Sequence, residues 1–184
     1  NKDGEPLIEL WDMNNQELIH KWNFKFREIK SKTGLKLNQN SITFTHPLLL
    51  SDGSLIVSTS VGTGPLIKFS KDGEVLKVNN EFIFHHSVEI DTQGRIYAPI
   101  RKSNSDLYTD GFAILDKDLN ILETHFLLDI YRAANLEYEL YSEGATNDPF
   151  HLNDVEPLQN KKETEFVLIS LAHQSSILAY DLKK

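Results

Sequence analysis

The sequence contains no cysteine, which excludes disulfide bonds, thiolate nucleophiles and cysteine metal sites. It has no apolar run of the roughly 20 residues that a membrane helix needs, so we expect no membrane span. It also has no long basic run, and its formal net charge is −8. Because nucleic acids and anionic membranes attract basic surfaces, we expect no nucleic-acid partner.

What is present is the composition of an ordinary folded protein. The chain has 184 residues, of which 40% are hydrophobic and 25% charged, enough for one domain with a substantial core. It starts at Asn1 rather than at a methionine and stops at Lys184, just after an expected strand. We therefore expect residues 1–184 to be one segment of a longer protein, with any targeting signal outside it.

Three stretches of the sequence follow one pattern. Residues 84–90 align with residues 151–157, so that Val-Glu matches Val-Glu, and residues 44–50 fit the same frame. Each stretch starts a strand that leads to a turn and a second strand. The positions that become equivalent are His46, His86 and Asn153.

The spacing of these stretches predicts the fold. Residues 41–79 contain four short β-rich runs separated by turn signals such as Ser-Asp-Gly, and residues 81–124 repeat the pattern. A unit of four antiparallel strands that recurs at about 40 residues is typical of a β-propeller. We therefore predict an all-β chain that forms three to four propeller blades, with the remaining blades supplied by the rest of the chain or by another chain.

Other segments lie outside this repeat. Residues 7–12 and 17–24 flank an Asn-rich turn and predict a hairpin. Residues 25–40 are polar and rich in Lys, Ser and Asn, which predicts a solvated loop. Residues 127–141 have apolar side chains at helical spacing, which predicts a short helical insertion.

The stretch from residue 148 to residue 158 carries the densest set of functional groups. Alternate side chains of a strand share a face, so we expect His151 and Asn153 to point one way and Asp154 the other. A polar pair is costly to bury without a partner or ligand, although Asn153 and Asp154 could simply cap the preceding turn. The side chains expected to converge on one central channel are His46, His86, His151 and Asn153.

These segments resemble the bacterial arylsulfate sulfotransferase family. The matching residues are His85-His86-Ser-Val, Phe150-His-Leu-Asn-Asp-Val155 and residues 168–178. The resemblance covers residues 7–182. It implies a six-bladed periplasmic propeller that moves a sulfuryl group from a phenolic sulfate ester to a phenol through a histidine intermediate, without a diffusible cofactor.

The resemblance also implies roles for single residues. His151 and Asn153 match the family's active-site histidine and asparagine, and His86 or its neighbour His85 matches a further central histidine. Imidazole and amide N–H groups can stabilise the oxygens of a sulfuryl group in transfer, and a neutral imidazole can deprotonate the acceptor phenol. The residues expected to catalyse are His86, His151 and Asn153, and those expected to contact substrate are His46, His85 and His173.

The sequence departs from the family at Ala172, where an arginine is expected. An arginine would hold the sulfuryl oxygens with a planar pair of donors, which alanine cannot do. His173 could substitute, but strand alternation is expected to turn it to the other face. The family's nucleophilic histidine belongs to a later blade, beyond Lys184.

Two other functions remain open. A calcium-dependent lactonase or esterase would use the oxygen ligands of Asn153, Asp154 and Glu156, but neighbouring residues of a strand face opposite sides. The other alternative is a non-catalytic propeller that binds a ligand or partner, which Ala172 favours. Because no ligand-type residues are closely spaced in the pattern of a metal site, we expect no bound calcium or zinc.

Overall fold

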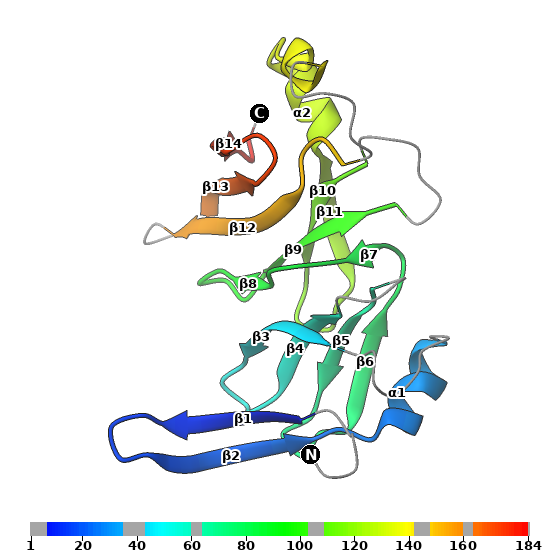
Figure 1. Cartoon of the computed structure of the whole chain (residues 1–184), viewed down its shortest axis with the longest axis vertical. Coiled ribbons are helices and arrows are strands. Elements are labelled where there is room, and N and C mark those ends of the chain that lie inside the picture. Colours follow the sequence, from blue (N-terminus) through cyan, green and yellow to red (C-terminus); the bar gives the residue numbers. More distant parts are fainter. Residues whose placement is uncertain are drawn as a thin grey trace.

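The computed structural model describes residues 7–34, 43–59, 64–102, 109–141, 148–159 and 164–183. Within these ranges most regular structure is strand, and the only helices are two α-helices and one 3-10 helix. The strands form four sheets, and every strand pairing is antiparallel (Figure 1). The predicted all-β class is therefore confirmed. No helix in the described ranges is long and apolar enough to cross a membrane.

The first sheet is the predicted hairpin, formed by β1 (Leu7–Asp12) and β2 (Glu17–Asn23). Helix α1 (Phe26–Thr33) follows it and ends at Gly34, whose φ is 69°. The prediction of a loop was wrong for residues 26–33. Phe26, Ile29 and Thr33 are buried and share one helix face, so a narrow buried stripe forms the helix despite the polar composition.

The three larger sheets contain the predicted series of short strands. The second sheet has the order β3–β4–β5–β6, and the fourth has the order β12–β13–β14. In the third sheet the order is β11–β10–β9–β7, and β8 also pairs with β9.

The second sheet comprises β3 (Phe44–Leu49), β4 (Leu55–Thr59), β5 (Leu66–Phe69) and β6 (Val75–Asn79). The third comprises β7 (Ile83–Phe84), β8 (Glu89–Ile90), β9 (Ile96–Arg101), β10 (Gly111–Leu115) and β11 (Ile121–Phe126). The fourth comprises β12 (Leu152–Gln159), β13 (Thr164–Leu171) and β14 (Ser176–Asp181).

One predicted strand is interrupted. A continuous strand was predicted over residues 84–90, but β7 ends at Phe84 and β8 starts at Glu89. Between them His86 has a φ of 55°, which lies in the left-handed region that strands do not use. The prediction of an unbroken strand was therefore wrong for residues 85–88.

The helical insertion lies between the third and fourth sheets. It consists of α2 (Leu127–Ala133) and the 3-10 helix η2 (Glu137–Tyr141), which confirms the predicted helical character of this segment. Asn135, between the two helices, has a φ of 57°. That left-handed residue divides the insertion into two short helices instead of one.

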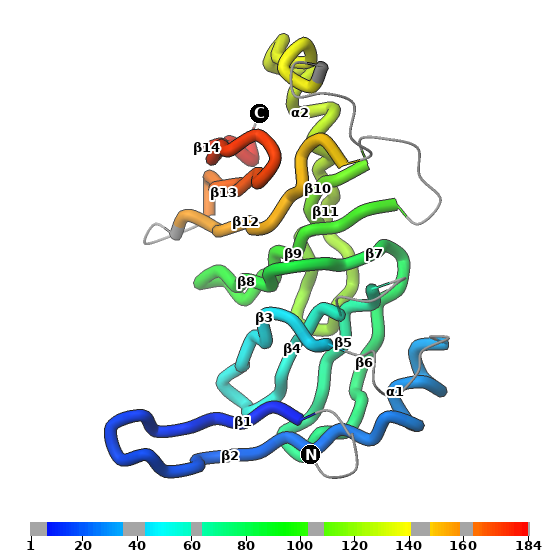
Figure 2. The backbone as a smooth tube through the Cα atoms, viewed as in Figure 1, coloured from blue at the N-terminus to red at the C-terminus, as the bar shows by residue number. Residues whose placement is uncertain are grey.

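Three apolar clusters hold successive parts of the chain together, and Figure 2 follows these parts along the long axis of the molecule. Between the hairpin with α1 and the second sheet lie Trp22, Phe24, Ile29 and Phe69. Between the second and third sheets lie Ile56, Leu66, Phe84 and Ile96. Between the third and fourth sheets lie Tyr97, Phe112, Val155 and Ile169. Strands β4, β5 and β10 are buried at every residue, because neighbouring layers cover both of their faces.

Candidate functional site

Three histidines adopt a backbone conformation that is uncommon for residues other than glycine. The φ angles of His46, His86 and His151 are 46°, 55° and 46°, all in the left-handed region. Each histidine lies where the first strand of a sheet is irregular or begins: β3 is bulged, β7 and β8 are separated, and β12 starts directly after His151. Such conformations cost about 1–3 kcal/mol each and gather at functional sites. The repeated irregularity therefore marks a candidate site.

The φ angles change the equivalence predicted from the sequence, which grouped His46 and His86 with Asn153. The left-handed φ links His46 and His86 to His151. Asn153 shares a different feature with His46, because each lies in a bulge where the pairing of the first strand with the second shifts register. In the fourth sheet these two backbone features therefore belong to two residues, His151 and Asn153, whereas in the second sheet His46 has both.

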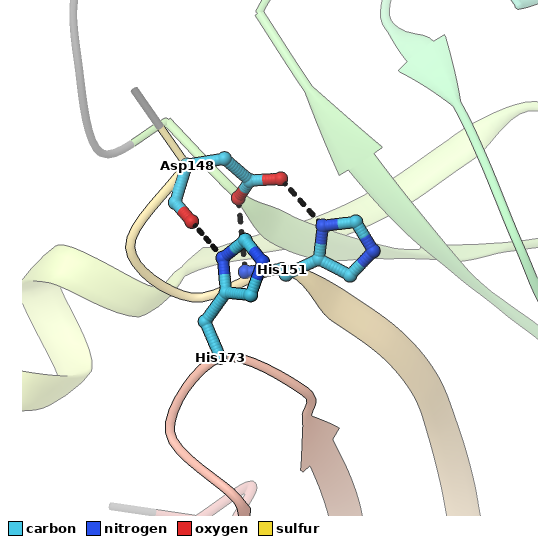
Figure 3. A group of neighbouring side chains, drawn as sticks. All are labelled: Asp148, His151 and His173. Atoms are coloured by element: carbon cyan, nitrogen blue, oxygen red, sulfur yellow. Dashed lines mark hydrogen bonds and ion pairs between the residues drawn. The ribbon is translucent and has the colours of Figure 1, made fainter. Parts of the chain in front are cut away.

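Asp148 holds two imidazoles (Figure 3). Its Oδ2 lies 2.8 Å from His151 Nδ1, and its Oδ1 accepts the His151 backbone N–H at 2.9 Å. Its backbone carbonyl oxygen lies 2.6 Å from His173 Nδ1. The centroids of the His151 and His173 rings are 4.6 Å apart. Two separate turns of the chain are joined in this way around one residue, through its carboxylate and its backbone carbonyl group.

These contacts select the tautomer of both rings. Burial raises the pKa of Asp148, but hydrogen bonds from the His151 backbone N–H, from Asp110 and from the His151 ring outweigh burial and leave that pKa below its ordinary value. A carboxylate and a carbonyl oxygen can only accept, so Nδ1 carries the proton in both rings. Each neutral ring therefore presents an unprotonated Nε2, which can act as a base or as a metal ligand.

Two further imidazoles adjoin His151. The centroid of the His86 ring lies 5.4 Å from that of His151 and 5.1 Å from that of His85. Burial lowers the pKa of His86, and the positive charge that His151 has when it is protonated lowers it further. Burial, followed by the charges of His86 and Arg101, lowers the pKa of His85 to about 4. We call His85, His86, His151 and His173 the histidine cluster.

A second carboxyl group, that of buried Asp110, adjoins Asp148. Asp110 is only 4% exposed, and its Oδ2 accepts the Leu152 N–H at 3.3 Å. Burial, followed by the negative charge of Asp148, raises the pKa of Asp110 to about 7. Because two adjoining carboxylates repel each other, the proton stays on Asp110, which shares a hydrogen bond with Asp148.

Arg101 brings a positive charge to the histidine cluster. It is half-buried at the end of β9, and its charge helps to lower the pKa of both His85 and His86. Neither Arg101 nor Asp110 was recognised from the sequence, where they flank a polar loop and belong to no motif. For Asp148, the one available signal was its position three residues before His151.

His173 and Ala172 lie in a turn. Strand β13 ends at Leu171, and residues 172–175 lead into β14. The expectation that His173 faces away from His151 was wrong, because alternation applies only within a strand. Ala172 donates its N–H to the carbonyl oxygen of His151 at 3.1 Å, so the position of the expected arginine does adjoin the histidine cluster.

His46 has a different partner. Its Nε2 lies 3.2 Å from Glu89 Oε1, and burial followed by the charge of Glu156 raises the pKa of Glu89. In the part of the chain that the structure describes, no hydrogen bond or ring contact joins His46 or Asn153 to the histidine cluster. Their convergence on a common channel stays a prediction.

Neither a protein-family model nor a curated protein matches this sequence. One similar solved structure is that of a protein of unknown function from Bacteroides caccae, with a TM-score of 0.47 and 9% sequence identity. The match covers 94% of this chain and 49% of that chain, so this chain spans about half the length of that protein.

Proposed function

We propose that the chain forms consecutive blades of a β-propeller, with β3, β7–β8 and β12 as the innermost strands. The order of the strands in the second sheet supports this proposal, because each strand pairs with the next one in the chain. The packing of successive sheets against each other supports it as well. The histidine cluster then lies at the inner ends of two neighbouring blades.

The proposed activity is transfer of a sulfuryl group from a phenolic sulfate ester to a phenol. The observation that carries it is the His151–Asp148 pair, which in the neutral ring keeps the proton on Nδ1 and so makes Nε2 the available base, beside His86. Nε2 takes the proton of the acceptor phenol as the sulfuryl group reaches a new oxygen. The bond from sulfur to the first phenol oxygen breaks, and the proton returns to that oxygen, so atoms and charge balance.

Arg101 binds the sulfuryl oxygens in place of the arginine that was expected at position 172. The sulfuryl oxygens carry negative charge throughout the transfer, and a guanidinium holds such oxygens with paired donors. Arg101 comes from the neighbouring sheet and acts electrostatically on His85 and His86. N–H groups of His86 and Asn153 complete the set of donors.

The test uses the full-length protein, 4-nitrophenyl sulfate as donor and an added phenol as acceptor. His151→Ala, His86→Ala and Arg101→Ala should each slow nitrophenol release by roughly two orders of magnitude, the scale of one preorganised donor. The loss should appear in kcat more than in KM, because these groups act on the transition state. His20→Ala is the matched control, since His20 bonds to Lys71 in the turn between β5 and β6.

Asp148→Asn is the second variant. It keeps the side-chain volume but removes the charge that holds the His151 tautomer, so kcat should fall by about 10²-fold while the unfolding transition is kept. Ala172→Arg should raise the rate only if Arg101 is an incomplete substitute. A folded protein that releases no nitrophenol with any phenolic acceptor would contradict the activity and favour the non-catalytic binding propeller.

A further inference from the structure

Asp148, His151 and His173 together form a set of metal-ligand type. The ligand atoms that these side chains offer lie within 4.8 Å of one another. Two ligand atoms of one tetrahedral zinc ion, each about 2.0–2.2 Å from it, are about 3.3–3.6 Å apart. The widest separation therefore has to close by about 1 Å when an ion binds. His173 is exposed and lies in a turn, so its side chain has room to move by that amount.

The surroundings of these three residues match those of known metal ligands. Ligating histidines commonly donate their other ring N–H to a carboxylate or a backbone carbonyl, and ligating carboxylates are themselves hydrogen-bonded. Here His173 Nδ1 lies 2.6 Å from the Asp148 carbonyl oxygen. The Asp148 carboxylate accepts the His151 backbone N–H and shares a hydrogen bond with buried Asp110. His151 Nδ1 and Asp148 Oδ2 lie 2.8 Å apart in a hydrogen bond, so an ion shared by these two groups would replace that bond and its proton.

The donor types select the class of metal. One carboxylate and two imidazoles suit zinc and its divalent transition-metal neighbours, whereas calcium and magnesium prefer oxygen ligands only. A metal ion binds carboxylate in its ionised form and imidazole in its neutral form, so the three ligands together would bring a charge of −1 to a dication. We propose that Asp148, His151 and His173 bind one divalent transition-metal ion of the zinc class, with the ring of His86 as the nearest further donor.

The sequence predicted the opposite, because His151 and His173 are 22 residues apart (173 − 151) and form no ligand motif. The fold brings them together by placing the start of β12 beside the turn after β13. A bound ion would make His151 a ligand rather than a base. We therefore expect zinc to inhibit the proposed sulfuryl transfer, so the two functions exclude each other at this residue.

The test is calorimetric titration of the chelator-treated chain with zinc chloride. We expect one saturable site per chain with a micromolar or tighter Kd. His173→Ala and Asp148→Asn should each weaken it by at least about tenfold. His20→Ala should leave the Kd unchanged, and it controls for zinc held by a single surface histidine. Titration with Co²⁺ should produce the visible absorption of a site with nitrogen and oxygen ligands.

His173→Ala is the decisive variant, because His173 is an exposed turn residue whose loss should leave the thermal unfolding transition in place. Binding weaker than millimolar, or a Kd that neither His173→Ala nor Asp148→Asn changes, would overturn the proposal. The titration contains no sulfate ester. A failed transfer assay therefore leaves the metal site standing, and a failed titration leaves the transfer proposal standing.

Discussion

Two aspartates of the third sheet reach across to the fourth sheet, and they do so in opposite ways. Asp91, in the turn before β9, accepts the backbone N–H groups of Gln93 and Arg95, each at 2.9 Å. It also accepts Arg95 Nε at 2.8 Å, Tyr97 Oη at 3.1 Å and Thr164 Oγ1 at 3.2 Å. All five of these donors belong to the protein itself, and the contacts with Tyr97 and Thr164 are buried.

Asp110 reaches the fourth sheet with far fewer donors. Among the residues that the structure describes, its side chain accepts one N–H, from Leu152, and faces a second carboxyl group, that of Asp148. The pKa values differ accordingly. Burial raises the pKa of Asp91, but hydrogen bonds from Arg95 and the Arg95 charge leave it below its ordinary value, whereas the pKa of Asp110 rises to about 7.

This difference separates a structural site from a functional one. The donors around Asp91 satisfy its charge completely, so the group has nothing left to offer a ligand. Around Asp110 and Asp148 the described residues supply fewer donors, and the two carboxyl groups adjoin each other and the His151 ring. Perturbed carboxylates of this kind, with incomplete internal partners, are typical of binding and catalytic sites.

Asp91→Asn should have the largest effect on stability. The amide cannot accept from all five donors, and its NH₂ group would face Arg95 and Tyr97, so we expect a loss of about 3 kcal/mol in the free energy of unfolding. The matched control is Asp116→Asn, because Asp116 accepts similar turn contacts from Asp118 and Asn120 but is accessible to solvent. Its loss should be about 1 kcal/mol or less in urea denaturation. Equal losses for the two variants would contradict the comparison.

The pH dependence of unfolding should show an intermediate effect. Asp91 has a lowered pKa in the folded state, so its contribution to stability is complete above the unfolded-state pKa of about 3.9 and is lost as the pH falls through the folded value. Urea denaturation from about pH 6 to pH 3 should therefore bring the wild type and Asp91→Asn closer together. A gap that stays constant down to the lowest pH would show that the charge of Asp91 contributes nothing.

Asp110→Asn should have the smallest effect. A protonated Asp110 donates to Asp148 and accepts from Leu152, and an asparagine amide can do both. We expect the free energy of unfolding to change by about 1 kcal/mol or less at pH 6. The measurement is the same urea titration, with Asp91→Asn run beside it. A loss as large as that of Asp91→Asn would mean that Asp110 is ionised and that the two aspartates are alike.

The sequence alone was sufficient for most of the strands. Alternating apolar residues and local turn signals predicted the hairpin, the second sheet and the first two strands of the fourth sheet. Trp22 and Phe24 of the hairpin lie in the core, where they are 2% and 1% exposed. Strand alternation and turn chemistry are local properties, so neighbouring residues encode them. The helix at residues 26–33 was missed because its buried stripe of three residues is short and lies in a Lys-rich segment.

The histidine cluster depended on contacts that no local pattern encodes. His151 was visible as a polar residue before a strand, but its carboxylate partners and Arg101 are recognisable only once the third and fourth sheets pack together. His173 joins His151 because β13 ends one residue before Ala172, and the left-handed backbone of His86 is not signalled by a glycine. The sequence by itself determined the strands, their turns and much of the core, since these follow from residues close together in the chain. The meeting of four imidazoles, two carboxyl groups and an arginine was decided by the tertiary structure, because only the packing of separate sheets brings groups from distant parts of the chain near one another.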